Sequence, residues 1–183
     1  IELENQSISK WKMSVPLQTT LYGHSSVAGN GKIYVIGGFS LQSRNCTAAI
    51  YSFNPLTKTW KTHTPMKYPR GFAGAVFINN KIYVIGGNDM HNTLNSVEIY
   101  DTISDTWSIG ASMPTPRRGH AIAGLNDKIY CIGGFDLSTR NTLSNVEMYN
   151  IQANIWNKLQ DLPFPRQGAS AVASSNRIYV IGG

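Results

Sequence analysis

The sequence has few cysteines, little charge and no long apolar run. Its two cysteines, Cys46 and Cys131, stand far apart and outside any CxxC spacing, which argues against a disulfide framework and against a zinc site. No apolar stretch reaches the roughly 20 residues that a membrane helix needs, and no signal peptide opens the chain. With 42% hydrophobic and 14% charged residues the chain is still globular. These absences predict a protein of a reducing, cytoplasmic compartment with no membrane segment.

The charge that is present is basic but scattered. The net charge is +6 and the sequence pI is about 9.4, while no basic run is longer than Arg117-Arg118. A tail that binds nucleic acid would need a denser cluster. We therefore expect no nucleic-acid partner, and we expect acidic proteins or peptides to be the partners that this charge favours.

Helix signals are nearly absent as well. Residues with β-branched or aromatic side chains dominate the apolar segments, and proline or glycine interrupts every possible helical window. The sequence therefore predicts an all-β protein.

One segment occurs four times with small changes. It reads "NGKIYVIGG" at 30–38, "NNKIYVIGG" at 79–87, "NDKIYCIGG" at 126–134 and "SNRIYVIGG" at 175–183. The first glycine of each pair falls at 37, 86, 133 and 182, and a tryptophan stands 26 residues before each of them, at 11, 60, 107 and 156. Steps of 49, 47 and 49 residues with one rigid part predict stacked repeats within a single domain, 1–183.

The repeated "IYVI" is apolar on both faces, so its sheet must be covered on both sides. Identical four-stranded sheets packed face to face around an axis achieve this, with tryptophans wedged between them and glycines that allow neighbouring backbone to approach closely. The predicted fold is a β-propeller of four-stranded antiparallel blades. Cys131 replaces a repeated valine and is expected to be a buried small hydrophobe. The residues expected to build the scaffold are Trp11, Trp60, Trp107, Trp156, Gly37, Gly38, Gly86, Gly87, Gly133, Gly134, Gly182 and Gly183.

These anchors resemble the kelch repeat. "GG" follows "IYVI", a tyrosine stands in "VEIYD", a tryptophan in "DTW", and "MPTPRRGH" follows. The resemblance covers essentially the whole chain and implies a kelch-type propeller. The chain departs from the pattern where Thr20-Leu21 replaces the Pro-Arg pair and where Glu4 replaces the tyrosine.

The number of repeats raises the question of ring closure, because kelch propellers usually have about six or seven blades. The chain opens inside a third strand ("IELEN") and stops after a second one ("IYVIGG"), which predicts three complete blades and two half-blades. Three alternatives stay open: further repeats in a longer protein, a four-bladed ring closed by the two half-blades, or a ring that a second chain completes as a homo-oligomer.

The loops divide between two faces of the predicted propeller. The long loops "FSLQSRNC", "NDMHNTLN" and "FDLSTRNTLS" share one face with the proline-rich links between blades, and function on a repeat scaffold is expected on such loops. Residues that differ between repeats are better candidates for partner contact than residues that recur. The partner-binding candidates are Tyr22, Phe39, Arg44, Phe72, Asp89, His91, Arg118, Phe135, Asp136, Arg140 and Gln167.

Several of these candidates have a second interpretation. Arg44 and Arg140 share an offset within their loops and either bind a partner or are solvated. Phe39 and Phe135 either contact a partner or fill the base of their loops. Two loop carboxylates, Asp89 and Asp136, have no evident partner, which favours a solvated role over contact with a partner.

Arginine and aromatic side chains would ring the mouth of the propeller on this face. These types are the usual anchors of protein interfaces, and the guanidinium fork suits carboxylate or phosphate. Kelch domains that are similar to this chain commonly bind short acidic peptides there. The resemblance thus implies a protein-interaction module, as the substrate-recruiting part of a ubiquitin-ligase adaptor or as an actin and cytoskeleton binder.

Three arginines recur sixteen residues before their glycine pair, namely Arg70, Arg117 and Arg166. The recurrence favours a structural role, in which they pair with strand carboxylates such as Glu98 and Glu147. Contact with a ligand is the alternative.

Some kelch-like propellers are copper oxidases or sugar mutarotases, so an enzyme is the alternative function. A copper site needs clustered ligands. However, His24 and His120 share an offset typical of scaffold, His63 lies in a blade link, and only His91 lies in a long loop. We therefore expect no catalytic residue, no metal and no cofactor.

Overall fold

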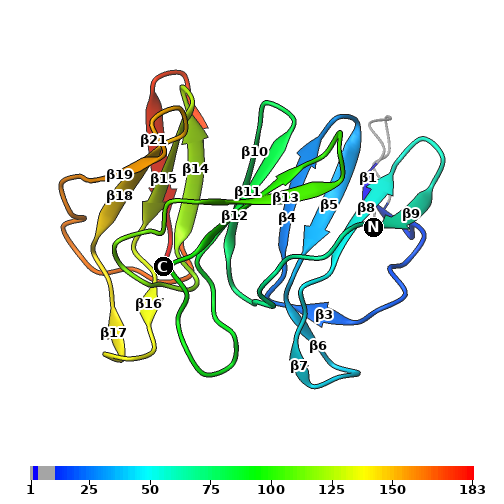
Figure 1. Ribbon diagram of the computed structural model, residues 1–183, viewed down its shortest axis with the longest axis horizontal. Helices are drawn as coiled ribbons and strands as arrows, with labels where there is room; N and C mark the ends of the chain where they lie inside the picture. Colours follow the sequence, from blue (N-terminus) through cyan, green and yellow to red (C-terminus); the bar gives the residue numbers. More distant parts are fainter. Residues whose placement is uncertain (1, 4–10) are drawn as a thin grey trace.

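The computed structural model describes residues 2–3 and 11–183, with side chains from Lys12 onward, and every regular element in these residues is a strand. Figure 1 shows the strands as upright sheets that stand side by side. The predicted all-β fold is confirmed.

Three four-stranded antiparallel sheets follow one another along the chain, and each pairs its strands in chain order. Blade 1 consists of β4 (Ser25–Gly29), β5 (Lys32–Ile36), β8 (Ile50–Asn54) and β9 (Thr59–Thr62). Blade 2 consists of β10 (Gly74–Ile78), β11 (Lys81–Ile85), β12 (Val97–Asp101) and β13 (Thr106–Gly110). Blade 3 consists of β14 (Ala121–Leu125), β15 (Lys128–Ile132), β18 (Val146–Asn150) and β19 (Ile155–Lys158).

Two half-blades accompany these sheets, as predicted. The N-terminal one pairs β1 (Glu2–Leu3) with β2 (Trp11–Lys12), and the C-terminal one pairs β20 (Ser170–Ser174) with β21 (Arg177–Ile181). They form separate sheets, and Figure 1 places β1 beside blade 1 and β21 beside blade 3. The alternative in which the two half-blades pair to close a ring is therefore not the arrangement in this structure.

The blades are arranged radially around the first strand of each. β10 contacts β4 on one side and β14 on the other, and β14 also contacts β20. Apolar side chains then fill the space between the blades. In β11, Ile82 and Val84 belong to the cluster shared with blade 1, whereas Tyr83 and Ile85 belong to the cluster shared with blade 3. The prediction that "IYVI" is covered on both faces is confirmed for this strand.

The outermost "IYVI" strand differs from this pattern. In β21, Tyr179 is 47% exposed and Ile181 is 66% exposed, because within the part of the chain described no further blade packs on that side. In blade 3, by contrast, Cys131 is fully buried among apolar neighbours, as predicted, and burial raises the pKa of its thiol to about 12.

The glycine pairs join neighbouring blades through their backbone. Gly87 donates its N–H to the carbonyl of Arg117 (2.9 Å), and Gly38 and Gly134 make the same bond to the arginine of the following repeat. A Cβ on Gly86 would lie 2.6 Å from the oxygen of Arg117, and the φ of Gly86 is +65°. Glycine is therefore required by both close approach and left-handed backbone.

The tryptophans join blades through their indole nitrogen. Trp60, Trp107 and Trp156 each donate the indole N–H to a carbonyl in the link that precedes their blade, at 2.7–2.9 Å. Each ring also packs against an aromatic ring of the third strand of its own blade, with centroids 4.9–5.1 Å apart. The predicted wedge role thus fits these three residues, while the side chain of Trp11 lies outside the described residues.

Two of the recurrent arginines form buried ion pairs, as predicted. Arg70 Nη2 lies 2.5 Å from Glu98 Oε1, and Arg117 Nη2 lies 2.8 Å from Glu147 Oε2, with both guanidinium groups fully buried. Each arginine also donates to the carbonyl of the first glycine of its pair, at 2.9–3.0 Å. Such satisfied pairs tie the link to the second and third strands of the blade.

The C-terminal half-blade and blade 1 lack this buried ion pair among the described residues. Arg166 donates to the carbonyl of Gly182 (2.9 Å), which is the equivalent bond in the C-terminal half-blade. Blade 1 has Leu21 at the arginine position and Tyr51, opposite Val35, at the glutamate position. Blade 1 thus replaces both the arginine and the glutamate by uncharged residues, and neither charge is left buried alone there.

Candidate partner-binding site

The long loops project from one end of the blades. β3 (Leu21–Tyr22), β6 (Phe39–Ser40) and β7 (Asn45–Cys46) form a small sheet, and β16 (Phe135–Asp136) pairs with β17 (Asn141–Thr142). In Figure 1 the ribbons β6–β7 and β16–β17 extend below the blades, opposite the tight hairpin turns. We call this end of the molecule the long-loop end.

A collar of residues with left-handed backbone joins the blades at the long-loop end. It consists of Gly23, Phe72, Gly119 and Gly168, whose φ values lie between 52° and 71°. Phe72 donates its N–H to Gly23 O (2.7 Å), Gly119 to Phe72 O (2.9 Å) and Gly168 to Gly119 O (2.8 Å). For a non-glycine residue this conformation costs about 1 kcal/mol. Backbone strain of this kind is found more often at binding sites and active sites, which makes Phe72 a candidate contact residue.

Phe72 packs with two further aromatic residues. Tyr22 and Phe39 are paired between β3 and β6, and their rings stack with centroids 5.1 Å apart. The ring of Phe72 lies 5.4 Å from that of Phe39 and 6.3 Å from that of Tyr22. Tyr22 is 50% exposed and Phe72 38%, whereas Phe39 is buried beneath them. We call these three residues the aromatic platform.

Arg118 lies beside the aromatic platform, between two rings. Its Cζ is 5.6 Å from the centroid of Phe72 and 5.5 Å from that of Phe135. Cation–π contacts of this kind contribute about 0.5–1 kcal/mol each and hold the guanidinium in place. Within the part of the chain that the structure describes, Arg118 pairs with no carboxylate. Its N–H donors therefore remain available to a ligand.

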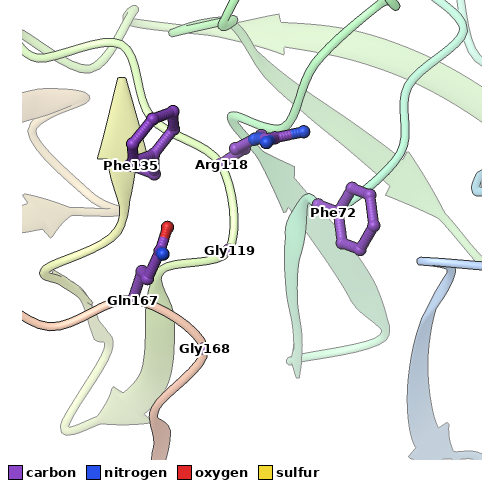
Figure 2. A pocket seen from close by; sticks show the side chains of 6 residues that line it. All are labelled: Phe72, Arg118, Gly119, Phe135, Gln167 and Gly168. Atoms are coloured by element: carbon purple, nitrogen blue, oxygen red, sulfur yellow. The ribbon is translucent and has the colours of Figure 1, made fainter. Parts of the chain in front are cut away.

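These side chains border a pocket of about 350 Å³. Figure 2 shows Arg118 between Phe72 and Phe135, with the amide of Gln167 directed toward Phe135. Gly119 and Gly168 complete the lining, and a Cβ on either would meet no atom within 4 Å, so the floor is open backbone. An arginine fork within apolar walls suits a carboxylate or a phosphate.

The structure brings together six of the predicted contact residues: Tyr22, Phe39, Phe72, Arg118, Phe135 and Gln167. Arg44 and Arg140 lie instead in the turns of the β6–β7 and β16–β17 ribbons, where both are exposed and have left-handed φ values of 53° and 58°. Neither lines the pocket. Their role in binding remains a prediction.

Asp136 has an internal partner that the sequence did not reveal. Its carboxylate accepts a hydrogen bond from Thr93 Oγ1 (2.6 Å) and further bonds from Ser138 and Thr139, and the residue is only 8% exposed. Burial alone raises its pKa, but these hydrogen bonds outweigh burial and hold the pKa at about 2. The expectation that Asp136 has no evident partner is wrong, because it ties β16 to the loop of blade 2.

Asp89 fixes a turn of the same blade 2 loop. Its Oδ1 accepts the backbone N–H groups of His91 (3.1 Å) and Asn92 (2.8 Å). Burial raises the pKa of Asp89, but hydrogen bonds, first of all from the Asn92 N–H, lower it overall. The side chain of His91 is exposed on this turn.

Sequence reasoning missed how blade 2 places Phe72. The repeats read Tyr22-Gly23, Arg118-Gly119 and Gln167-Gly168, whereas blade 2 reads Gly71-Phe72. A Cβ on Gly71 would lie 2.2 Å from the ring of Phe39, so the ring of the neighbouring blade occupies that space. The signal lies in the two positions that follow the recurrent arginine. The side chain comes first and the glycine second in the other repeats, and blade 2 reverses that order.

The histidines do not gather at this site. His120 is buried between blades against Gly74, and His63 Nε2 lies 2.7 Å from Ser52 Oγ, while His24 is exposed. Among residues 2–3 and 11–183 no three His, Cys, Asp or Glu side chains form a group that could hold a metal ion. The same residues contain no helix long and apolar enough to cross a membrane.

Radial four-stranded blades joined by diglycine and arginine contacts define a propeller of the kelch type. The family described as the KLHDC2/KLHL20/DRC7 Kelch-repeats domain matches residues 1–183. The chain therefore belongs to the kelch-repeat family.

Curated relatives match shorter parts of the chain. Kelch-like protein 40 of Xenopus tropicalis is 31% identical over 93 residues, which cover 50% of this chain and 15% of that protein. Kelch repeat and BTB domain-containing protein 12 of Danio rerio is 34% identical over 67 residues, or 33% of this chain and 11% of that protein. The chain thus spans a small part of the length of these relatives.

A solved structure agrees with the fold. The structure of YjhT superposes with a TM-score of 0.85 at 17% identity, over 96% of this chain and 63% of that one. At this identity the likeness supports the fold alone.

Proposed function

We propose that this chain is a protein-interaction module that binds an acidic segment of a partner at Arg118. The observation that carries the proposal is the guanidinium of Arg118, which lies between Phe72 and Phe135 with no carboxylate partner among the described residues. An arginine whose orientation is already fixed loses little conformational entropy when it binds. The net charge of +6 also favours an acidic partner.

Family membership supports the interaction role. The kelch-repeat match and the relative whose name includes a BTB domain support a place for this chain in a ubiquitin-ligase adaptor, as the part that recruits a substrate. An actin or cytoskeletal partner is the second form of the same proposal. Two free, buried cysteines, Cys46 and Cys131, fit the proposed cytoplasmic location.

The experiment compares a labelled glutamate-rich peptide with its glutamine counterpart by fluorescence anisotropy. We expect only the glutamate peptide to bind, with an affinity that falls as salt is added. Arg118→Ala should weaken binding about tenfold, since a hydrogen bond to a charged group contributes about 1.5–3 kcal/mol. Adding Arg140→Ala should weaken it further, with the melting temperature nearly unchanged.

Arg177→Ala is the matched control, because Arg177 is an exposed arginine beside the tight turns at the opposite end. It should leave the affinity unchanged. Free sugars and copper are titrated in parallel to test the enzyme alternative. Tight binding of a sugar or of copper, with no peptide bound, would overturn the proposal.

A further inference from the structure

The ring of Phe72 belongs to the aromatic platform and also contacts Arg118. The ring centroid lies 5.6 Å from Arg118 Cζ and 6.3 Å from the centroid of Tyr22. The exposed parts of Phe72 and Tyr22 thus form an apolar surface directly beside the guanidinium. A ligand bound at Arg118 therefore has an apolar surface within reach on the side of Phe72.

The backbone of blade 2 is arranged so that this ring can stand there. At the collar position the other repeats have Gly23, Gly119 and Gly168, and only Phe72 adds a side chain to left-handed backbone. A Cβ on Gly23 would lie 3.0 Å from the ring of Phe72, so the glycine of blade 1 makes room for it. Both features place an apolar ring next to a cation at the surface, where Phe72 stays 38% exposed although it also packs on Tyr22 and Phe39.

We infer that the partner segment is extended and carries a large apolar side chain two residues from the acidic one. The inference rests on the proposed function and specifies its ligand. In an extended chain, residues i and i+2 point to the same side and lie roughly 6.5–7 Å apart. Arg118 Cζ lies 5.6 Å from the centroid of Phe72, and the apolar surface continues to Tyr22, whose centroid lies 6.3 Å from that of Phe72. Side chains i and i+2 of an extended segment can therefore reach the guanidinium and this surface at the same time. Residue i+1 points away from the surface.

Isomeric peptides test the spacing directly. One glutamate and one leucine are placed one, two or three positions apart, in both orders, in a Gly/Ser host of constant length and composition. A glutamate-only peptide and a leucine-only peptide complete the set. We expect one of the two orders at spacing two to bind at least fivefold more tightly than spacings one and three.

The two levels of the proposal fail differently. If no glutamate-containing peptide binds, the proposed function and this inference both fail. If every glutamate peptide binds as well as the glutamate-only one, the proposed function stands and the spacing rule is wrong. A leucine-only peptide that binds as tightly as the best isomer would contradict the acidic requirement itself.

Variants at Phe72 connect the spacing preference to the structure. Phe72→Gly restores the residue type of the other repeats, relieves the left-handed strain and removes the apolar wall. It should abolish the spacing preference. The relief of backbone strain offsets only part of the packing lost against Tyr22 and Phe39, so the melting temperature should fall while unfolding stays cooperative. Phe72→Leu retains the strained backbone and an apolar side chain, so it should keep the preference with a smaller fold-difference. A preference that survives Phe72→Gly at full size would overturn the assignment.

Discussion

At the scale of single residues, glycine serves two separable needs in this chain. Gly86 and Gly31 have nearly the same left-handed φ, at +65° and +68°. Only Gly86 also faces a neighbouring carbonyl, whereas a Cβ on Gly31 would meet nothing within 4 Å. The pair therefore separates the effect of left-handed backbone from the effect of close approach.

We expect Gly31→Ala to lower the free energy of unfolding by about 1 kcal/mol, the cost of a left-handed non-glycine residue. Gly86→Ala adds a clash with the oxygen of Arg117 and should lower it by about 3 kcal/mol or more. Urea denaturation measures both. Equal losses would mean that the contact between blades adjusts freely.

His120 makes stability depend on pH. Burial, together with the charge of Arg117, lowers the pKa of His120 to about 3, below its unfolded value of about 6.5. Between these values the unfolded chain binds the extra proton, so stability is fully present above about pH 6.5 and is lost as the pH falls.

Between pH 6.5 and 5 the contribution of His120 should be a fall of about 1 kcal/mol per pH unit in the free energy of unfolding. His120→Asn removes the titrating group and should flatten the profile, whereas His24→Asn changes an exposed histidine at the equivalent position and should not. Urea denaturation at several pH values provides the data. An unchanged slope in His120→Asn would show that other groups cause it.

At the scale of elements, blades 2 and 3 each contain a buried arginine–glutamate pair, whereas blade 1 has apolar and aromatic residues at the same positions. Arg117 and Glu147 are both buried in blade 3, and Thr115 also donates to the Glu147 carboxylate (2.7 Å). Removing one partner of such a pair leaves a buried charge without compensation. Blade 1 shows the apolar alternative, with Leu21 and Tyr51 at the same two positions.

Glu147→Gln should therefore lower the free energy of unfolding by about 3 kcal/mol. The double variant Arg117→Leu with Glu147→Tyr reproduces the blade 1 pair and should be more stable than the single variant. The recovery will be incomplete, since Arg117 also donates to the carbonyls of Gly133 and Asn145. A double variant less stable than Glu147→Gln would show that the two blades are not equivalent here.

The sequence predicted the elements well where spacing is constant. The constant offset of 26 residues from each tryptophan to its glycine pair spans the first two strands of a blade. The recurrent arginine offset anticipated the pairs of Arg70 and Arg117. It did not predict the bond from Thr93 to Asp136, because the two lie 43 residues apart on loops that differ between repeats. It did name Phe72 as a contact residue, but it did not predict that this residue stands on left-handed backbone at a position where the other repeats have glycine.

At the scale of the whole molecule, burial declines from the middle blade toward the ends of the array. Val84 and Ile85 of β11 are fully buried, but Ile33 of β5 is 41% exposed and Ile181 of β21 is 66% exposed. Segments with fewer buried apolar contacts open at lower free energy than the core. The array should therefore open from its ends, starting with the half-blade β20–β21, which has no third or fourth strand among the described residues.

Hydrogen–deuterium exchange of the 183-residue chain tests this order. The amides of β11 and β15 should exchange most slowly and those of β20–β21 at least tenfold faster, because an opening free energy lower by about 1.4 kcal/mol corresponds to a factor of ten. Light scattering on the same sample reports the oligomeric state. If β20–β21 were protected as strongly as β11 in a monomer, the outer face of the half-blade would have to be covered within the chain itself, and the open array described by blades 1 to 3 would be wrong. If the same protection came with a dimer mass and was lost on dilution, a second copy would be covering that face.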